Sequence, residues 1–396
     1  MEENRLYSVW LSIRPGLTPK KIKSLIETYK TARTIYFLSQ SELNDAPLDE
    51  IVKQTLRNKN LDHAKHICEE CEKKGIDILE YNDDYYPPLL RNLPNPPFVL
   101  YKKGRDIDYR RYPIASIVGS RILSDYGKNV TEKISFDMAK QGFIVVSGMA
   151  LGADAAAHLS ALKGGMASVA VLGCGVDEIY PYENRDLYNK LCTYGAVLSE
   201  YPPGTKPERY NFPQRNRIVS GMSHLTVVTE ARIKSGSLIT AEYTNEQGKQ
   251  VFAVPQNINS PYGTGTNLIL KEYARVLTDS SDAYKYYVET YRDGNYTPVL
   301  EDAIKKRQTR KYKNPPINKT HKDLPDNLNE SEIKILNALR DGPKHINKIS
   351  NETGYPLGKI RAIATLLEIR GLVYTVEGNA YAMTSKDVWN SGEARL

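Results

Sequence analysis

The chain has 396 residues, of which 40% are hydrophobic and 26% charged, and its formal net charge is +7. This length and composition favour a soluble globular protein of two or three domains. No apolar run approaches the roughly 18 residues needed to span a bilayer, which excludes a membrane-spanning protein. The four cysteines are too few for a disulfide framework, and residues 1–4 lack the basic and apolar segments of a signal peptide. We therefore expect a protein of the reducing cytoplasm.

The positive charge is concentrated in one stretch. Residues 305–322 contain eight basic residues and no acidic one, and without these eight the net charge changes from +7 to −1. We expect residues 301–326 to form a disordered basic linker that can attract nucleic acid without sequence preference. A merely solvated tether is an equally good interpretation. The folded parts are then nearly neutral, so any anion site in them must be a local cluster.

Residues 1–80 are predicted to form a helical domain of the SAM-like or helix-hairpin-helix-like kind, because apolar residues such as Trp10 and Leu25 recur at helical spacing. The stretch 15–19 interrupts the first helix pair and resembles the loop of a helix-hairpin-helix, whose glycines free backbone amides for a DNA phosphate. Thr18 stands where the second glycine is expected. Simple packing of helices is therefore the default interpretation.

Four residues of metal-ligand type lie close together in this region: His63, His66, Cys68 and Cys71. On a helix, at about 100° per residue, they spread over about 200°. Ligands spread so widely cannot meet one tetrahedral ion. We therefore predict ordinary helix residues here and no metal site.

The segment 81–112 is predicted to be an extended connector, because five prolines between residues 87 and 97 exclude a regular helix. Residues 113–300 then alternate short apolar runs with helical patterns. This alternation favours an α/β domain with a Rossmann-like, mostly parallel sheet and helices on both faces. Right-handed crossovers place the ligand loops at the C-terminal ends of the strands. The apolar runs are Ile114–Val118, Phe143–Val146, Ala167–Leu172, Ala196–Leu198, Leu225–Val228 and Val251–Val254.

The glycines of these loops do not form a dinucleotide fingerprint. After the first run they fall at Gly119 and Gly127, and Glu178 stands where a third glycine after Gly173 and Gly175 would be required. There is no Walker motif either. A redox enzyme and a P-loop ATPase are thus disfavoured.

The segment 211–237 combines an apolar run with an aromatic residue and several cations. A helix that begins after Lys234 would present free amides, and these amides with nearby cations suit an anionic ligand such as phosphate. Phe212 offers a face on which a base can stack. The alternative interpretation is that the arginines solvate a sheet edge and Phe212 belongs to the core. The cations are Arg215, Arg217, Arg232 and Lys234.

Residues 327–390 are predicted to form a winged helix-turn-helix domain. Three helical patterns precede two short runs, 373–376 and 381–383, which favour a hairpin. The third helix has a weakly basic face, so contact with duplex DNA and contact with protein are equally plausible. The charged residues of that helix are Lys359, Arg361, Glu368 and Arg370.

Six motifs follow one another in a specific order between residues 85 and 277. They are Gly119–Arg121, Ser147–Asp154 with His158, Tyr180–Asn184, Ser199–Gly204, Phe212–Arg217 and Ser235–Ala241. In this order they resemble the DNA-processing protein A family (DprA, also called Smf), and the terminal domains also resemble parts found in that family. The departures from the family pattern are Ala153 for isoleucine, Gln256 for glycine, and Tyr273 for glycine before Ala274. They affect packing and turns more than charge.

The resemblance implies a Rossmann-like domain that binds single-stranded DNA without hydrolysing it and forms a homodimer. It also implies that the protein protects incoming strands and helps to load the RecA recombinase onto them during natural transformation. No catalytic residue, cofactor or metal is expected. Carried over from the family, the residues of the strand-binding pocket are Gly119, Ser120, Arg121, Gly148, Arg209, Phe212, Arg215, Asn216, Arg217, Lys234, Ser235, Gly236 and Ser237.

Two alternatives stay open. Related Rossmann hydrolases of the lysine-decarboxylase-like group process nucleotides with a motif that residues 261–266 nearly match. The glutamate of that motif is replaced by Ile269 here, and by Thr240 in the segment that begins at Gly236, which leaves no evident general acid or base. The second alternative is a transcription regulator that acts through the winged helix while the central domain senses a nucleotide.

Overall fold

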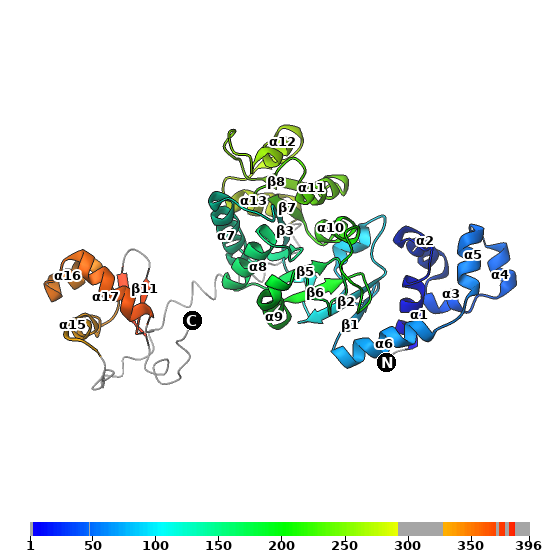
Figure 1. The fold of residues 1–396 in the computed structure, drawn as a ribbon, viewed down its shortest axis with the longest axis horizontal. Helices are drawn as coiled ribbons and strands as arrows, with labels where there is room; N and C mark the ends of the chain where they lie inside the picture. Colours follow the sequence, from blue (N-terminus) through cyan, green and yellow to red (C-terminus); the bar gives the residue numbers. More distant parts are fainter. Residues whose placement is uncertain (1–2, 47, 292–327, 370–371, 377–379, 385–396) are drawn as a thin grey trace. The chain divides into compact units, whose positions relative to one another are not determined.

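Figure 1 shows the computed structural model, which describes residues 3–46, 48–291, 328–369, 372–376 and 380–384. The chain divides into two compact units, Met1–Thr309 and Arg310–Leu396. The predicted basic linker, residues 301–326, lies outside the described residues. In the described part of the chain, no helix has both the length and the apolar character that a membrane-crossing segment needs.

Within the described residues, a nine-stranded sheet forms the centre of the first unit. The strands are β1 (Asp77–Glu80), β2 (Val99–Gly104), β3 (Ile114–Val118), β4 (Ile144–Ser147), β5 (Ser168–Leu172), β6 (Ala196–Ser199), β7 (Leu225–Val228), β8 (Gln250–Ala253) and β9 (Arg275–Val276). Their order is β1-β2-β6-β5-β4-β3-β7-β8-β9, and β3 to β9 are parallel to their neighbours within that group. The predicted mostly parallel sheet is confirmed. The strand order reverses at β3, which has β4 on one side and β7 on the other.

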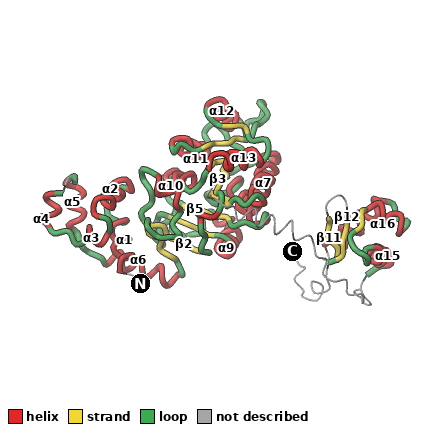
Figure 2. The backbone as a smooth tube through the Cα atoms, turned by 180° about the vertical axis from the view of Figure 1, so that it is seen from behind, coloured by secondary structure: helices red, strands yellow, loops and turns green. Residues whose placement is uncertain are grey.

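Helices cover both faces of the sheet (Figure 1 and Figure 2). One face packs against α10 (Asn211–Gly221), α11 (Gly236–Glu246) and α12 (Thr264–Glu272). The other face packs against α7 (Asp125–Lys140), α8 (Ala153–Lys163), α9 (Arg185–Tyr194) and α13 (Ser280–Tyr291). The strands read as continuous apolar runs because both of their faces are buried: Val169 and Val171 face one core, and Ala170 between them faces the other.

The segment 81–112 differs from the predicted connector, because it contains β2, which pairs antiparallel with both β1 and β6. The prolines that suggested a connector end at Pro97, before the strand begins at Val99. They lie in the loop between β1 and β2 and in the 3₁₀ helix η1 (Pro88–Asn92), so they do not interrupt the ladder. Strand β1 was not predicted either, since its four residues end a segment that reads as helical.

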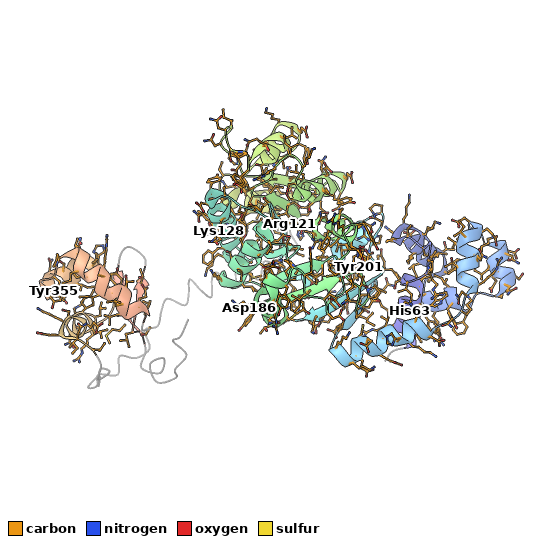
Figure 3. All side chains as sticks on the ribbon, viewed as in Figure 1. His63, Arg121, Lys128, Asp186, Tyr201 and Tyr355 are labelled. Carbon is orange, nitrogen blue, oxygen red and sulfur yellow. The ribbon has the colours of Figure 1, made fainter. Side chains whose placement is uncertain are left out.

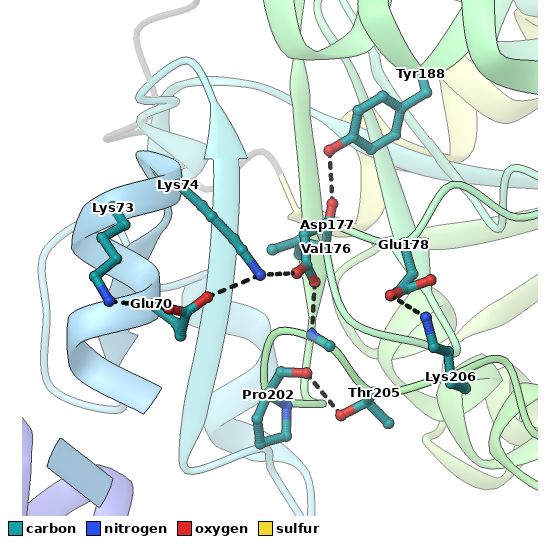
Figure 4. A network of polar contacts seen from close by, with 11 residues as sticks. Glu70, Lys73, Lys74, Val176, Asp177, Glu178, Tyr188, Pro202, Thr205 and Lys206 are labelled. Atoms are coloured by element: carbon teal, nitrogen blue, oxygen red, sulfur yellow. Dashed lines mark hydrogen bonds and ion pairs between the residues drawn. The ribbon is translucent and has the colours of Figure 1, made fainter. Parts of the chain in front are cut away.

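Six helices of the described residues precede the sheet: α1 (Glu3–Ser12), α2 (Pro19–Tyr29), α3 (Ala32–Tyr36), α4 (Gln40–Asp45), α5 (Glu50–Arg57) and α6 (Asp62–Lys74). Their apolar residues, among them Trp10 and Leu25, share one core with Val197 of the sheet. Lys74 at the end of α6 also pairs with Asp177, in the segment after β5, at 2.8 Å (Figure 4). The helical region is therefore packed onto the sheet within a single unit.

Helix α6 carries the four residues that suggested a metal site. Cys68 and Cys71 are buried in the core, whereas His63 (Figure 3) and His66 are exposed. The two pairs thus lie on different sides of the helix. Among the described residues, no group of three or more histidine, cysteine, aspartate or glutamate side chains is placed to hold a metal ion.

His224, just before β7, is hydrogen-bonded to residues of β3 and α13. Its Nδ1 accepts a hydrogen bond from the Ile114 N–H at 3.1 Å, and the Tyr291 hydroxyl of α13 donates to its carbonyl at 3.1 Å. Burial lowers the pKa of His224 to about 4. The folded chain therefore keeps this imidazole neutral at a pH where an exposed histidine is protonated.

We expect the free energy of unfolding to fall as the pH is lowered from 6.5 to about 4, because over this range the unfolded chain binds a proton at His224 and the folded chain does not. One such proton contributes a slope of about 1.4 kcal/mol per pH unit. Urea unfolding across this range measures the slope. His224→Asn, whose side-chain oxygen can accept the Ile114 N–H, should flatten it by one proton, and an unchanged slope in this variant would contradict the assignment.

The second unit has three helices and a small sheet in its described residues. They are α15 (Glu330–Ala338), α16 (Ile346–Thr353), α17 (Leu357–Ile369), β10 (Lys344–His345), β11 (Val373–Val376) and β12 (Ala380–Met383). The predicted winged helix-turn-helix is confirmed, with β10 as an additional strand beside β12. On α17 only part of the predicted basic face is free, because the Lys359 ammonium lies 3.9 Å from the centroid of the Tyr355 ring. Arg361 is exposed, and Arg370 lies outside the described residues.

Candidate nucleic-acid interface

A cavity of about 760 Å³ opens at the C-terminal ends of β3, β4 and β7. It lies where the strand order reverses between β3 and β7, and doubly wound sheets bind their ligands at this switch point. Of the thirteen residues predicted for the pocket, all of them described, twelve line the cavity. They are Gly119, Ser120, Arg121, Gly148, Arg209, Phe212, Arg215, Asn216, Lys234, Ser235, Gly236 and Ser237.

Two aromatic rings form one wall of the cavity. Phe212, in the first turn of α10, and Tyr180 have ring centroids 5.3 Å apart. The guanidinium carbon of Arg121 lies 6.0 Å from the centroid of the Phe212 ring (Figure 3 marks Arg121). Tyr180 is 40% exposed, and a second cavity of about 390 Å³ adjoins this wall. A flat aromatic surface beside a cation is a platform on which a nucleic-acid base can stack.

Four cations on the cavity wall are exposed to solvent: Arg121, Arg209, Arg232 and Lys234. With the other described residues, none of the four forms an ion pair. Arg232 instead lies over the Tyr262 ring, 4.7 Å from its centroid. These side chains keep their charge available for an anion, which agrees with a local cluster in an otherwise nearly neutral fold.

Two helices begin at the cavity and turn their positive ends toward it. Helix α10 begins at Asn211, next to Phe212, and α11 begins at Gly236. Ser235 caps α11 by accepting the Ser237 N–H at 3.4 Å, and Asn216 of α10 donates to the Gly236 carbonyl at 3.2 Å. The dipole of a helix favours a bound phosphate at such an end.

Arg215 lines the cavity but is only 6% exposed. Its guanidinium donates to the Gly148 carbonyl at 2.8 Å and to the Val171 carbonyl. Asp154 accepts the Gly148 N–H at 3.1 Å, so the arginine and the aspartate hold the same residue. Burial raises the pKa of Asp154, and the charge of Arg215 acts in the opposite direction. Arg215 is therefore part of the frame of the cavity and not one of its free charges.

Only glycine fits at position 148. A Cβ atom there would lie 2.4 Å from a terminal nitrogen of Arg215, so any other residue would displace the guanidinium from its hydrogen bonds to the Gly148 and Val171 carbonyls. The glycine in the loop after β4 thus makes room for the buried guanidinium, and no nucleotide phosphate is needed to explain it.

The prediction that Arg217 lines the pocket is not supported by the structure, because this residue lies away from the cavity. It is 6% exposed, and its Nη2 donates to both carboxylate oxygens of Glu200 at 2.6 and 2.7 Å. Residues two apart on a helix are separated by about 200°, so Arg215 and Arg217 cannot face the same side of α10. The two-residue spacing of the arginines in the motif therefore predicts that only one of them faces the cavity.

The lining residues that the pocket prediction did not include are Val118, Ile122, Ala150, Asp154, Tyr180, Pro213, Val219, Arg232, Ile239 and Thr240. Arg232 follows the end of β7, the position from which a parallel strand sends residues into the cavity. Asp154 is the one carboxylate among the lining residues, and its contacts are with the backbone N–H groups of Gly148 and Ala150. At the positions where the hydrolase motif has glutamate, Thr240 lines the cavity and Ile269 is buried in the core.

The chain matches two family models. Residues 77–288, which include the whole sheet, match the model of DNA recombination-mediator protein A. Residues 319–379 match the model of the DprA winged helix domain.

Relatives of known name support the same assignment. Protein Smf from Synechocystis is 33% identical over 96% of this chain and 98% of its own length. DNA processing protein DprA from Streptococcus pneumoniae is 38% identical over 55% of this chain and 76% of its own length. The crystal structure of the Streptococcus pneumoniae protein superposes with a TM-score of 0.62 and 30% identity, over 71% of this chain and 97% of that one. A structure of DNA processing protein A from Helicobacter pylori, which concerns its single-stranded DNA binding mode, gives a TM-score of 0.50 and 29% identity, over 55% of this chain and 97% of that one. The chain belongs to the DNA recombination-mediator protein A family, also known as DprA or Smf.

Proposed function

We propose that the chain binds single-stranded DNA in the cavity at the switch point of the sheet and carries out no chemistry on it. The observation that supports this most is that four exposed cations, none ion-paired with another described residue, line the same cavity as the Phe212 and Tyr180 rings. Cations suit the phosphates of a strand, and aromatic rings suit its unpaired bases. Single-strand binding by the Helicobacter pylori relative is in keeping with this use of the cavity.

The cavity offers little for catalysis. Asp154, the one carboxylate among the described residues that line it, is 8% exposed and bonded to the backbone, so it is not free to act as a general acid or base. His158, from the family motif, is fully buried, and its Nδ1 is within 2.7 Å of the Ser168 hydroxyl. A hydrolytic function is therefore the weaker candidate.

Binding should weaken with salt to a degree that the four free cations determine. If each neutralises one phosphate of a single strand, the slope of log K against log salt is about −2.8, or roughly fiftyfold weaker binding from 50 to 200 mM salt. Arg215 and Arg217 are omitted because their charges are buried and already engaged. Fluorescence anisotropy of a labelled oligothymidine over a salt series measures this slope.

The same titration with duplex DNA and with a mononucleotide tests the alternatives. We expect the single strand to bind tightest, because only unpaired bases can reach the rings. A preference for duplex would favour a regulator that acts through the winged helix. A slope several units steeper would assign the binding to the basic segment 301–326. Release of free base from the mononucleotide would establish a hydrolase.

We further propose that the chain acts as a cytoplasmic homodimer formed through the Rossmann-like domain, protects incoming strands and loads the RecA recombinase onto them during natural transformation. Family membership supports this role. The measurement is the lag before RecA filaments form on single strands, which the chain should shorten. An unchanged lag would leave a strand-binding protein without the loading role.

We also expect a chain without residues 326–396 to retain its single-strand affinity, because the cavity lies wholly within the first unit.

A further inference from the structure

Glu230 is a fully buried carboxylate near the end of β7, two residues before the cavity-lining Arg232. Its side chain reaches the beginning of α7. One carboxylate oxygen accepts the Ser124 N–H at 2.8 Å, and the other accepts the Ser124 hydroxyl at 2.6 Å. The same hydroxyl accepts the Gly127 N–H at 3.0 Å, so the carboxylate stands at the first turn of the helix.

The backbone of Glu230 holds the same loop at a second point. Its carbonyl accepts the Ser120 N–H at 2.7 Å, while the Ser120 carbonyl accepts the Ala153 N–H at 3.0 Å. A Cβ atom at Gly119 would lie 3.0 Å from the Glu230 carbonyl and 2.7 Å from the Ala153 Cβ, so nothing larger than glycine fits between them. The loop from Gly119 to Ser124 is thus attached to Glu230 at both ends.

This carboxylate also takes the place of a ligand. In nucleotide-binding Rossmann folds, the N-terminus of the helix after the first strand receives a phosphate. Here the carboxylate of Glu230 fills that position. A Cβ atom at Gly127 would lie 2.4 Å from one of its oxygens, so the glycine makes room for it. The cation that this loop presents to the cavity is therefore an exposed side chain, Arg121.

We infer that Glu230 is a positioning residue for strand binding: its carboxylate and carbonyl hold the loop from Gly119 to Ser124 so that Arg121 stays beside the Phe212 ring. The inference rests on the proposed binding of single-stranded DNA. Glu230 then supports the binding of a polyanion, although its negative charge alone would predict that it weakens this binding.

The test compares Glu230→Ala with Glu230→Gln by anisotropy with labelled oligothymidine. Glutamine can accept the Ser124 N–H with its oxygen and donate to the Ser124 hydroxyl, so this variant should bind within about threefold of the original chain. Alanine frees the loop and should weaken binding about tenfold, which is the loss we expect from Arg121→Ala alone. If Glu230 acts through Arg121, the double variant binds about as weakly as Arg121→Ala, whereas independent effects would make it about a hundredfold weaker than the original chain. Glu246→Ala, which removes an exposed carboxylate from α11, is the charge control and should bind like the original chain.

A second readout needs no DNA. Trypsin cuts after Arg121 only when the loop opens, so cleavage at this bond, mapped by mass spectrometry, should be about tenfold faster in Glu230→Ala and unchanged in Glu230→Gln. Ser124→Ala removes a partner of the carboxylate and should accelerate the cut even if Glu230→Ala fails to fold. Unchanged cleavage and binding in the alanine variants would overturn the inference, as would additive losses in the double variant. A chain that binds no strand, but whose loop is freed by Glu230→Ala, would refute the proposed function and leave the positioning role in place.

Discussion

Arg215→Ala is expected to lower the free energy of unfolding by about 2–6 kcal/mol, since each of the two buried carbonyls that lose a donor costs about 1–3 kcal/mol. The guanidinium satisfies the buried carbonyls of Gly148 and Val171 and opposes the charge of Asp154. Without it, the carbonyls lose these donors and the buried Asp154 loses a nearby positive charge. Urea unfolding at pH 7 measures the loss.

Arg209→Ala is the matched control, since Arg209 lines the same cavity but is exposed. Its removal should change the free energy of unfolding by no more than about 0.5 kcal/mol, as is usual for surface substitutions, while it weakens strand binding. Comparing the two variants thus distinguishes an arginine that maintains the structure of the cavity from one that supplies charge for strand binding. If Arg215→Ala kept the original stability and lost strand binding, Arg215 would have to contact the strand directly.

The central sheet was predictable because strands buried on both faces leave apolar runs in the sequence. The runs at 114–118 and 225–228 matched β3 and β7. They allowed the prediction that ligand loops lie at the C-terminal ends of these strands, where the cavity opens. The edge strands left no such trace. Both residues of β9 are exposed, and only the two middle residues of β1 are buried, so neither strand gives a pattern of period two or an apolar run.

Most of the pocket followed from a resemblance of ordered motifs, which identifies residues but not the direction of their side chains. Arg215 and Arg217 look alike in the sequence, and only their partners distinguish them. Arg215 donates to the carbonyl of Gly148, in the loop after β4, and to that of Val171 in β5, whereas Arg217 pairs with Glu200. Spacing on α10 separates the two arginines by about 200°, yet it does not tell which one faces the cavity.

Glu230 shows a second limit of sequence reasoning. Its partner Ser124 lies 106 residues earlier in the chain. In the sequence, a glutamate beside Arg232 and Lys234 reads as a charge that opposes an anion site. Only the packing of α7 against the end of β7 turns it into a residue that supports that site.

Replacing Phe212 by alanine should weaken single-strand binding by about 1–3 kcal/mol, the contribution of one stacked base, which is about 5- to 150-fold in affinity. The salt slope should stay the same because the ring carries no charge. Arg121→Ala should act differently: it should reduce the slope by about 0.7, the share of one phosphate. Anisotropy over a salt series measures both quantities.

Phe212→Leu separates stacking from packing. The Phe212 ring lies against the backbone of Gly173, where a Cβ atom would be 2.9 Å from the ring. Leucine keeps apolar volume there but offers no flat face, so it should bind almost as weakly as alanine, whereas Phe212→Tyr should bind like the original chain. Lys128→Ala on α7, outside the cavity lining, controls for a general loss of charge and should leave the slope unchanged. Full affinity in Phe212→Leu would mean that the ring serves only to pack α10 against the sheet, and the strand would then be held by the four cations alone.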